Sequence, residues 1–358
     1  MRLCSNTILA ALLGGAALLA PAQPRPASTA NAQTTPGQAP PLTVDTDPVR
    51  SPDAGLTPSL GPLRKQGREG YILRTDVEEV VLNATVLSDN HLVQNLTKND
   101  FEIYEDGVKQ NILSFQHTDL PVSMGLVIDN SGSMYKKRPA VNKAALDLVE
   151  ASNREDQAFV VNFSDEAFID QDFTSDISKL RDGLSHIDSR GGTALYDAIV
   201  ASADKLAADA QRPKQVLVVI TDGEDNASTL NLEQTIRRVQ QLSGPVIYSI
   251  GLLYGNEMDR GEVRRARRAL ELLSSETGGM AFFPKNLNQV DEIAGEVARD
   301  IRTQYTLGYR STKPTSIPGF RRVQVIARAK GMGKLEVRTR TGYYPNVRPK
   351  QTAESTQP

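Results

Sequence analysis

The sequence has few of the residues that form disulfides, soft-metal sites and acid–base catalytic groups. It contains one cysteine, Cys4, three histidines and no tryptophan. A single cysteine cannot form an internal disulfide, so the folded part must be stabilised by its core alone. The histidines, His91, His117 and His186, belong to different predicted elements, which argues against a histidine-based hydrolytic site. The net charge of −2 gives no reason to expect nucleic-acid binding.

Long apolar runs are also scarce, and the clearest one lies at the N-terminus. Residues 8–20 are mostly apolar, follow Arg2 and lead into Ala-Pro-Ala at 20–22, which predicts a signal peptide at 1–22. The run is too short to favour a membrane anchor. We therefore expect a bacterial protein exported to the periplasm, the cell envelope or the extracellular space, without an integral membrane span after cleavage. The lack of disulfides fits a bacterial envelope better than a eukaryotic secreted protein.

Composition and periodicity divide the rest of the chain into regions. A proline-rich stretch without aromatic residues predicts a disordered linker at 23–70, and a short disordered tail is predicted at 348–358. Between them we predict N-terminal β strands at 71–120, an α/β domain at 121–303 and C-terminal β strands at 304–347.

In the α/β region, apolar strands alternate with amphipathic helical patterns. Strands are predicted near 122–128, 157–163, 167–173, 216–221, 246–250 and 280–283, and helices near 139–151, 177–187, 195–208, 232–242, 262–276 and 287–302. This alternation predicts a doubly wound, mainly parallel sheet of the Rossmann-like class. The strand near 167–173 follows its predecessor closely and is expected to form an antiparallel edge hairpin.

The β strands on either side of this domain are too few to fold alone. Three are predicted before it, near 79–86, 101–105 and 111–115, and four after it, near 305–309, 322–327, 334–338 and 342–344. Because three strands cannot bury a core, we expect one β-sandwich built from both flanks, with the α/β domain inserted in its sequence. Two separate small β units are the alternative.

Oxygen-bearing side chains occupy the places where an open α/β sheet binds ligands. Three of them follow the first strand, one follows the strand near 216–221 and one opens the helix near 195–208; they are Asp129, Ser131, Ser133, Asp222 and Thr193. Two carboxylates and three hydroxyls, with no histidine or cysteine, suit Mg²⁺ or Mn²⁺. Neutral hydroxyls leave the ion with residual positive charge and an open position, which an acidic side chain of a partner protein could fill.

The sequence motifs around these residues resemble those of a von Willebrand factor type A (VWA) domain. They are Asp-Asn-Ser-Gly-Ser-Met, Gly-Gly-Thr-Ala-Leu-Tyr-Asp-Ala and Ile-Thr-Asp-Gly-Glu-Asp-Asn. All five metal positions match the metal-ion-dependent adhesion site (MIDAS) of that family. The chain also resembles a bacterial group of VWA proteins with β-rich flanks, through the motifs at 100–107, 305–309 and 340–344.

The resemblance implies an exported, adhesion-type module that captures an acidic residue of a partner protein through a bound Mg²⁺ ion. An envelope assembly or maturation factor, whose VWA domain organises a protein complex, is the alternative. A metal-dependent enzyme is disfavoured because no general base adjoins the metal residues in the sequence, so we expect no enzymatic activity. Neighbours of the metal motifs are candidates for the rim of the site: Tyr135, Lys136, Lys137, Asp225 and Asn226.

Overall fold

The computed structural model describes residues 79–345, except 152, 187–188, 243 and 255–258. All described residues belong to one compact unit. The predicted signal peptide, linker and C-terminal tail lie outside them. In the described part of the chain, no helix is long and apolar enough to cross a membrane.

A six-stranded sheet forms the centre of the α/β domain, with the strand order β11-β10-β9-β6-β7-β8. The strands are β6 (Val122–Asp129), β7 (Gln157–Phe163), β8 (Ala167–Thr174), β9 (Lys214–Thr221), β10 (Val246–Gly251) and β11 (Ala281–Phe282). All neighbours pair in parallel except β7 and β8, which form the expected antiparallel edge. Every residue of β6 is buried, which explains its unbroken apolar run.

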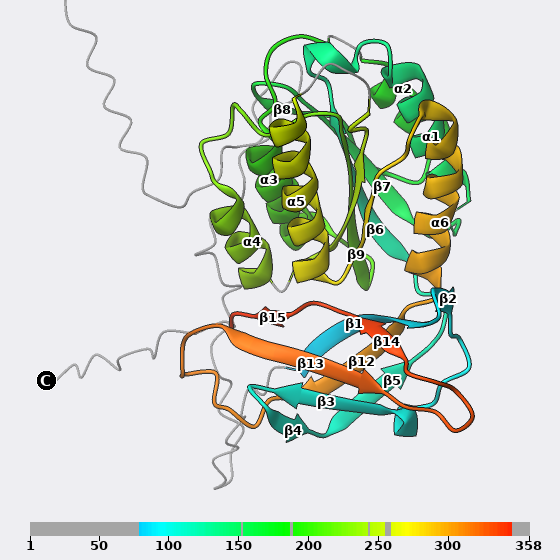
Figure 1. Cartoon of the computed structure of the whole chain (residues 1–358), viewed down its shortest axis with the longest axis vertical. Coiled ribbons are helices and arrows are strands. Elements are labelled where there is room, and N and C mark those ends of the chain that lie inside the picture. The colour runs from blue at the N-terminus through cyan, green and yellow to red at the C-terminus, as the bar shows by residue number, and fades with distance from the viewer. Residues whose placement is uncertain (1–78, 152, 187–188, 243, 255–258, 346–358) are drawn as a thin grey trace, which may run out of the picture. The chain divides into compact units, whose positions relative to one another are not determined.

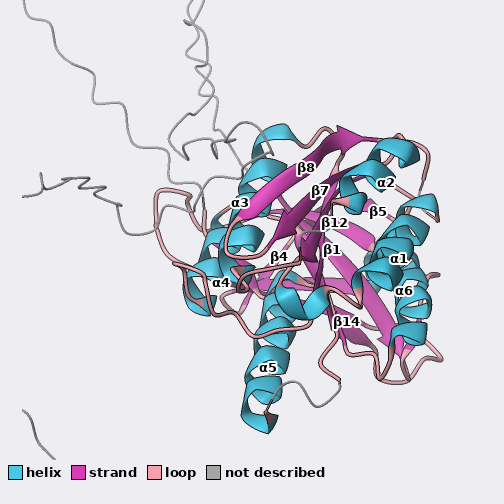
Figure 2. Ribbon diagram, turned by 90° about the horizontal axis from the view of Figure 1, so that it is seen from above, coloured by secondary structure: helices cyan, strands magenta, loops and turns pink. Residues whose placement is uncertain are grey.

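Three helices cover each face of this sheet (Figures 1 and 2). The helices α1 (Arg138–Glu150), α2 (Ile177–Ser185) and α6 (Val290–Arg302) pack on one face, and their apolar side chains share a core cluster with the sheet. The helices α3 (Leu195–Asp209), α4 (Leu232–Gln241) and α5 (Arg260–Thr277) cover the other face. The predicted doubly wound α/β class is confirmed.

Helix boundaries differ from the predicted ones where capping residues set them. Asp259 caps α5 by accepting hydrogen bonds from the backbone N–H groups of Gly261 and Glu262, so the helix begins two residues before the predicted start at 262. At its other end, Gly278 adopts a φ of 91°, a left-handed conformation that suits glycine. The predicted helix 287–302 begins with a separate 3₁₀ turn, Leu287–Gln289, and α6 follows it.

The flanking strands form two further antiparallel sheets. One has the order β14-β1-β12-β5, with β2 beside β1, and the other has the order β15-β13-β3-β4. The N-terminal strands are β1 (Glu79–Ser88), β2 (His91–Leu92), β3 (Phe101–Glu105), β4 (Val108–Gln110) and β5 (Ile112–Gln116). The C-terminal strands are β12 (Tyr305–Arg310), β13 (Arg321–Ala327), β14 (Glu336–Arg338) and β15 (Gly342–Tyr343).

Strands from both flanks alternate within these sheets. Strand β1 lies between β12 and β14, and β3 pairs with β13. Their inward side chains form a single apolar cluster that contains residues from both flanks, such as Leu82, Ile103 and Leu307. Two short strands, β2 and β4, were not predicted. Strand β4 follows a turn in which Asp106 and Gly107 both have positive φ, as a tight hairpin requires.

Polar contacts join the α/β domain to the sandwich strands. The carboxylate of Asp300 on α6 accepts hydrogen bonds from Tyr248 Oη at 2.9 Å and from Arg338 Nη2 at 3.2 Å. The backbone N–H of Thr341 donates to the carbonyl of Glu276 at 3.2 Å. Because Asp300 and Tyr248 are buried, these contacts fix the last turn of α6 against strand β14.

Candidate metal centre

The sheet topology brings the predicted metal residues to one edge. Asp129 ends β6, and Asp222 follows β9, which lies beside β6 in parallel register. Ser131 and Ser133 belong to the turn that follows β6, and Thr193 lies two residues before α3. Carboxyl ends of adjacent parallel strands point to the same edge of a sheet, which is where doubly wound folds bind ligands.

Asp129 is the innermost member of the group. Its side chain has no exposed surface, and its two oxygens accept hydrogen bonds from Ser131 N at 2.8 Å and from Thr221 Oγ1 at 2.5 Å. Burial raises the pKa of Asp129 to about 6, and the nearby charge of Asp222 acts in the same direction, while the two hydrogen bonds oppose the shift. Bringing a cation to this carboxylate would therefore favour its ionised form.

A line of short polar contacts connects the hydroxyls with the second carboxylate. Ser131 Oγ lies 3.2 Å from Ser133 Oγ, and Ser133 Oγ donates to Asp222 Oδ1 at 2.8 Å. The other oxygen of Asp222 accepts a hydrogen bond from Lys137 Nζ at 2.5 Å. The Asp222 side chain is fully buried, so its charge is balanced by this ammonium and not by bulk water.

Thr193 is held in place by its own loop. Its N–H donates to Asn226 Oδ1 at 2.9 Å, and its carbonyl accepts from the N–H groups of Asn226 and Ala227. Before it, Gly191 has a φ of 78°, and a side chain there would meet the carboxylate of Asp165. A Cβ placed on Gly223 would lie 3.3 Å from Thr193 Oγ1, so the glycine after Asp222 lets the threonine hydroxyl approach.

Besides Lys137, two of the predicted rim residues have structural partners. Asn226 holds Thr193, as described, and Asp225 accepts hydrogen bonds from Ser228 Oγ at 2.5 Å and Tyr196 N at 3.2 Å. Burial raises the pKa of Asp225. These contacts fix the start of α3 against the loop after β9. Tyr135 and Lys136 are exposed, with 69% of Tyr135 accessible.

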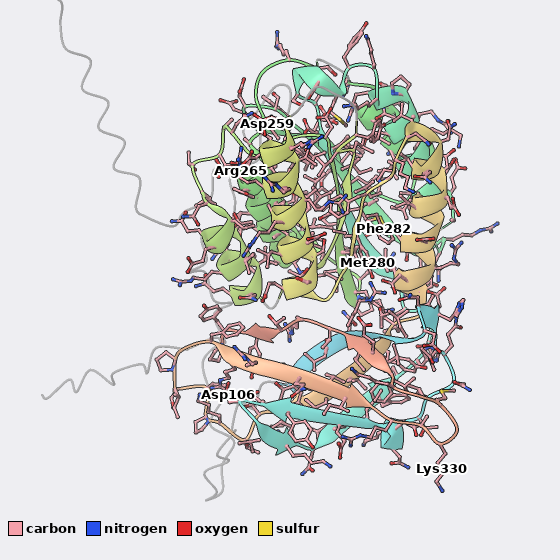
Figure 3. The ribbon with its side chains drawn as sticks, in the orientation of Figure 1. Asp106, Asp259, Arg265, Met280, Phe282 and Lys330 are labelled. Carbon is pink, nitrogen blue, oxygen red and sulfur yellow. The ribbon has the colours of Figure 1, made fainter. Side chains whose placement is uncertain are left out.

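A cavity of about 250 Å³ opens beside these residues. Its lining includes Ser133, Thr193 and Asp222 and, directly before α1, Lys137. The loops after β9 and β10 and the start of α5 supply the remaining lining residues: Gly223, Glu224, Asp225, Asn226, Leu253, Tyr254, Glu262 and Val263. Figure 3 labels Asp259 and Arg265 at this end of α5, and Arg265 Nε donates to Glu224 Oε1 at 2.7 Å. The cavity gives a ligand access to Ser133, whose hydroxyl contacts the buried Asp222 carboxylate.

Several lining residues were not anticipated from the sequence. Leu253 and Tyr254 follow β10, whose carboxyl end lies next to that of β9. That adjacency was the available signal, because every parallel strand sends its following loop to the same edge. Glu262 and Val263 reach the cavity from the first turn of α5.

The residues present fit a hard divalent cation. Two carboxylates and two hydroxyls lie in one connected set of contacts, and Thr193 lines the same cavity. Within the described part of the chain, no group of three or more histidine, cysteine or acidic side chains is placed to hold a metal. A site that uses hydroxyl ligands is not such a group. An oxygen-only donor set of this kind favours Mg²⁺ or Mn²⁺ over softer ions.

Comparison with a protein-family model agrees with the motif analysis. The family model for the von Willebrand factor type A domain matches residues 124–296. No curated protein sequence matches the chain. Among solved structures, the von Willebrand factor domain of a type V pili tip protein from Porphyromonas gingivalis is 13% identical, with a TM-score of 0.42, over 51% of this chain and 96% of that chain.

Two further structures are similar. An aerotolerance-related membrane protein from Bacteroides fragilis is 19% identical, with a TM-score of 0.41, over 50% of this chain and 98% of that chain. A von Willebrand factor type A protein from Catenulispora acidiphila is 13% identical, with a TM-score of 0.44, over 75% of each chain. The family match, at residues that form the sheet, its helices and the cavity described above, shows that the chain carries a von Willebrand factor type A domain at residues 124–296.

Proposed function

We propose that the protein is an exported binding module that captures an acidic side chain of a partner protein through Mg²⁺ or Mn²⁺. VWA domains are protein-interaction modules, and this chain carries one. The ion would be held by Asp129, Ser131, Ser133, Thr193 and Asp222. The observation that supports this most directly is the convergence of hydroxyl and carboxylate oxygens at one sheet edge, beside an open cavity.

The proposed ligands would hold the ion from different sides. Asp129 is fixed in the interior by hydrogen bonds from Ser131 N and Thr221 Oγ1, so it would hold the ion on the side that faces the sheet. Ser133 is exposed at the cavity and donates a hydrogen bond to the buried Asp222 carboxylate, so these two residues would hold the ion on the side that a ligand reaches. A bound divalent ion supplies an electrophilic position for a carboxylate oxygen. The three hydroxyls add no negative charge, which leaves the ion attractive to an anionic ligand.

Binding is favoured over catalysis by the state of the acidic residues at the rim. Glu224 pairs with Arg265, and Asp225 accepts hydrogen bonds from Ser228 and Tyr196. These contacts hold both carboxylates in place and position the loops around the cavity, a role that fits a binding site better than that of a general base facing a substrate proton.

Capture experiments test the proposal. The purified protein is immobilised and incubated with an envelope extract from its own cells, in Mg²⁺ or in EDTA. We expect bound proteins that are present in Mg²⁺, absent in EDTA and lost with Asp129→Ala. The matched control is Glu224→Gln, because Glu224 lines the same cavity but is not a proposed ligand. Partners retained in EDTA and by Asp129→Ala would contradict a metal-mediated contact.

Export forms a separate part of the proposal and has its own test. It is supported by the apolar run and the Ala-Pro-Ala sequence at 20–22. Protein recovered from the envelope or the medium is expected to begin at about residue 23, as measured by mass spectrometry of its N-terminal peptide. Recovery from the cytoplasm with residues 1–22 intact would contradict export.

A further inference from the structure

The ammonium group of Lys137 contacts Asp222, one of the two carboxylates proposed as metal ligands. Lys137 Nζ is 2.5 Å from Asp222 Oδ2, whereas Asp222 Oδ1 accepts the hydroxyl of Ser133. Only 12% of the Lys137 side chain is exposed and none of the Asp222 side chain. Water screens a pair this buried much less than it screens a surface pair. The contact is therefore strong enough to affect what else can bind Asp222.

The backbone directs Lys137 toward the site. The residue follows the 3₁₀ turn Gly132–Met134, and its N–H donates to the carbonyl of Met134 at 2.8 Å. It is the last residue before α1, so the helix fixes the base of the side chain. Its ammonium also lies 5.8 Å from the ring centroid of Tyr254, which lines the same cavity.

The next residue places a second cation near the other carboxylate. Arg138 is fully buried, and its Nη2 donates to Asn162 Oδ1 at 2.8 Å and to the carbonyl of Leu184 at 3.3 Å. Burial lowers the pKa of Arg138 to about 10, and the charges of Asp129 and Asp170 oppose that shift. Lys137 is therefore the cation in direct contact with a proposed metal ligand, whereas Arg138 contacts Asn162 and Leu184. The adjacent Lys136 is exposed instead.

We propose that Lys137 competes with the divalent ion for Asp222 and thereby determines the metal affinity of the site. This inference rests on the proposed metal site and deepens it. A divalent cation and an ammonium in contact with the same carboxylate repel each other strongly in a buried setting. Binding of the ion therefore requires Lys137 Nζ to leave Asp222 Oδ2. The free energy of breaking that ion pair reduces the affinity for the ion.

Metal titration by calorimetry tests this competition. Mg²⁺ is titrated into the full chain as wild type, Lys137→Met, Lys137→Arg and Lys136→Met. We expect Lys137→Met to lower the dissociation constant at least about tenfold, because it removes the like-charge repulsion while preserving side-chain length. Lys137→Arg, which keeps the charge, should bind within about threefold of wild type, and Lys136→Met, which removes a lysine charge on the exposed side, within about twofold.

The outcomes separate this inference from the proposed function. Equal or weaker Mg²⁺ binding by folded Lys137→Met, in a wild type that binds Mg²⁺, would overturn the competition and leave the metal site intact. Failure of every form, including wild type, to bind Mg²⁺ or Mn²⁺ would overturn the proposed function and the competition with it.

A second measurement does not depend on the folding of Lys137→Met. Protein with ¹⁵N-labelled lysine side chains is titrated with Mg²⁺, and the ammonium resonance of Lys137 is assigned by its loss in Lys137→Arg. We expect this resonance to shift or broaden in step with metal binding, while that of Lys143, which pairs with Asp147 and Asp291 away from the cavity, stays constant. A Lys137 resonance unchanged at saturating Mg²⁺ would overturn the proposal.

Discussion

Two buried acidic groups in this molecule have opposite surroundings. Glu105, in the sandwich, accepts hydrogen bonds from Tyr309 Oη at 2.7 Å and Tyr343 Oη at 2.9 Å and lies 3.5 Å from Arg321 Nη1. Asp222, at the edge of the α/β sheet, is held by Ser133 and Lys137 and lines an open cavity. Both side chains are almost inaccessible. The two groups differ in their further surroundings: Glu105 is enclosed by other side chains of the sandwich, whereas Asp222 lies beside the cavity.

The partners of Glu105 come from distant parts of the chain. Glu105 is the last residue of β3, while Tyr309, Arg321 and Tyr343 belong to β12, β13 and β15. Burial and the adjoining carboxylate raise the pKa of both tyrosines, so they stay neutral donors. This cluster joins the two flanks and serves stability. Burial of a carboxylate therefore does not identify a binding site unless the group also faces a cavity.

The largest effect is expected from removing one flank. A chain lacking residues 304–358 loses the neighbours of β1 and β3, because these strands pair with β12, β14 and β13. We expect residues 79–116 to lose protection in hydrogen exchange completely, since the remaining strands cannot bury a core. A chain lacking only residues 346–358 is the control and should keep it. Protected N-terminal strands in the shorter chain would contradict a shared core.

The sandwich cluster should tolerate charge removal poorly. Glu105→Gln leaves the guanidinium of Arg321, which is 1% exposed, without its carboxylate. We expect a loss of about 3–5 kcal/mol in the free energy of unfolding, measured in urea, with metal binding preserved in the folded protein. The control is Glu102→Gln in the same strand, whose side chain is 26% exposed and pairs at the surface, so that its loss in stability should be much smaller. A similar cost for both variants would remove the contrast.

At the proposed metal site, ionisation of the buried Asp129 carboxyl should lower the stability of the metal-free protein. The folded pKa of Asp129 is about 6, above its ordinary value of 3.8, so the folded state binds more protons between these values. In EDTA, the free energy of unfolding of wild type relative to Asp129→Asn should therefore fall as pH rises from about 4 to 6, by about 2–3 kcal/mol. Urea unfolding at each pH measures this difference. If the difference in the free energy of unfolding stays constant or rises with pH, the raised pKa of the buried Asp129 carboxyl is contradicted.

A smaller effect is expected at the contact between the two regions. Arg338 on β14 reaches both oxygens of Asp300 on α6 at 3.2 Å. Arg338→Met should lower the free energy of unfolding by about 1–2 kcal/mol, because Tyr248 remains as a partner of Asp300. Arg328→Met, which removes an exposed pair with Glu102, is the control and should cost clearly less. Equal costs would show that the buried contact adds nothing.

Most of the α/β fold could be predicted because its signals are local. Buried parallel strands carry continuous apolar runs, and all six strands of the sheet were found within two residues at each end; β6 and β7 are examples. The edge strand β11 is one residue shorter at each end than the predicted 280–283. In the flanks, β2 and β4 are too short to show alternation and owe their pairing to neighbours in the sheet.

The candidate site was predictable to the extent that motifs mark it. Asp129, Ser131, Ser133, Thr193 and Asp222 were named from the sequence, and the structure places them at one edge. The contact between Lys137 and Asp222 was not foreseen, because it depends on how the turn after β6 leads into α1. Tyr254 was missed, because its approach depends on the strand order β10-β9-β6, which no local pattern reveals. The assignment of the five motif residues, Asp129, Ser131, Ser133, Thr193 and Asp222, as metal ligands stays a prediction.

Direct measurement of metal binding tests the central claim. Calorimetry of the purified protein with Mg²⁺ or Mn²⁺ is predicted to show one bound ion, with binding abolished by Asp129→Ala and by Asp222→Ala while circular dichroism shows the fold retained. Glu224→Gln, which alters another acidic residue of the same cavity, should keep the wild-type affinity within about threefold. Unchanged metal affinity in both alanine variants would contradict the assignment of the site.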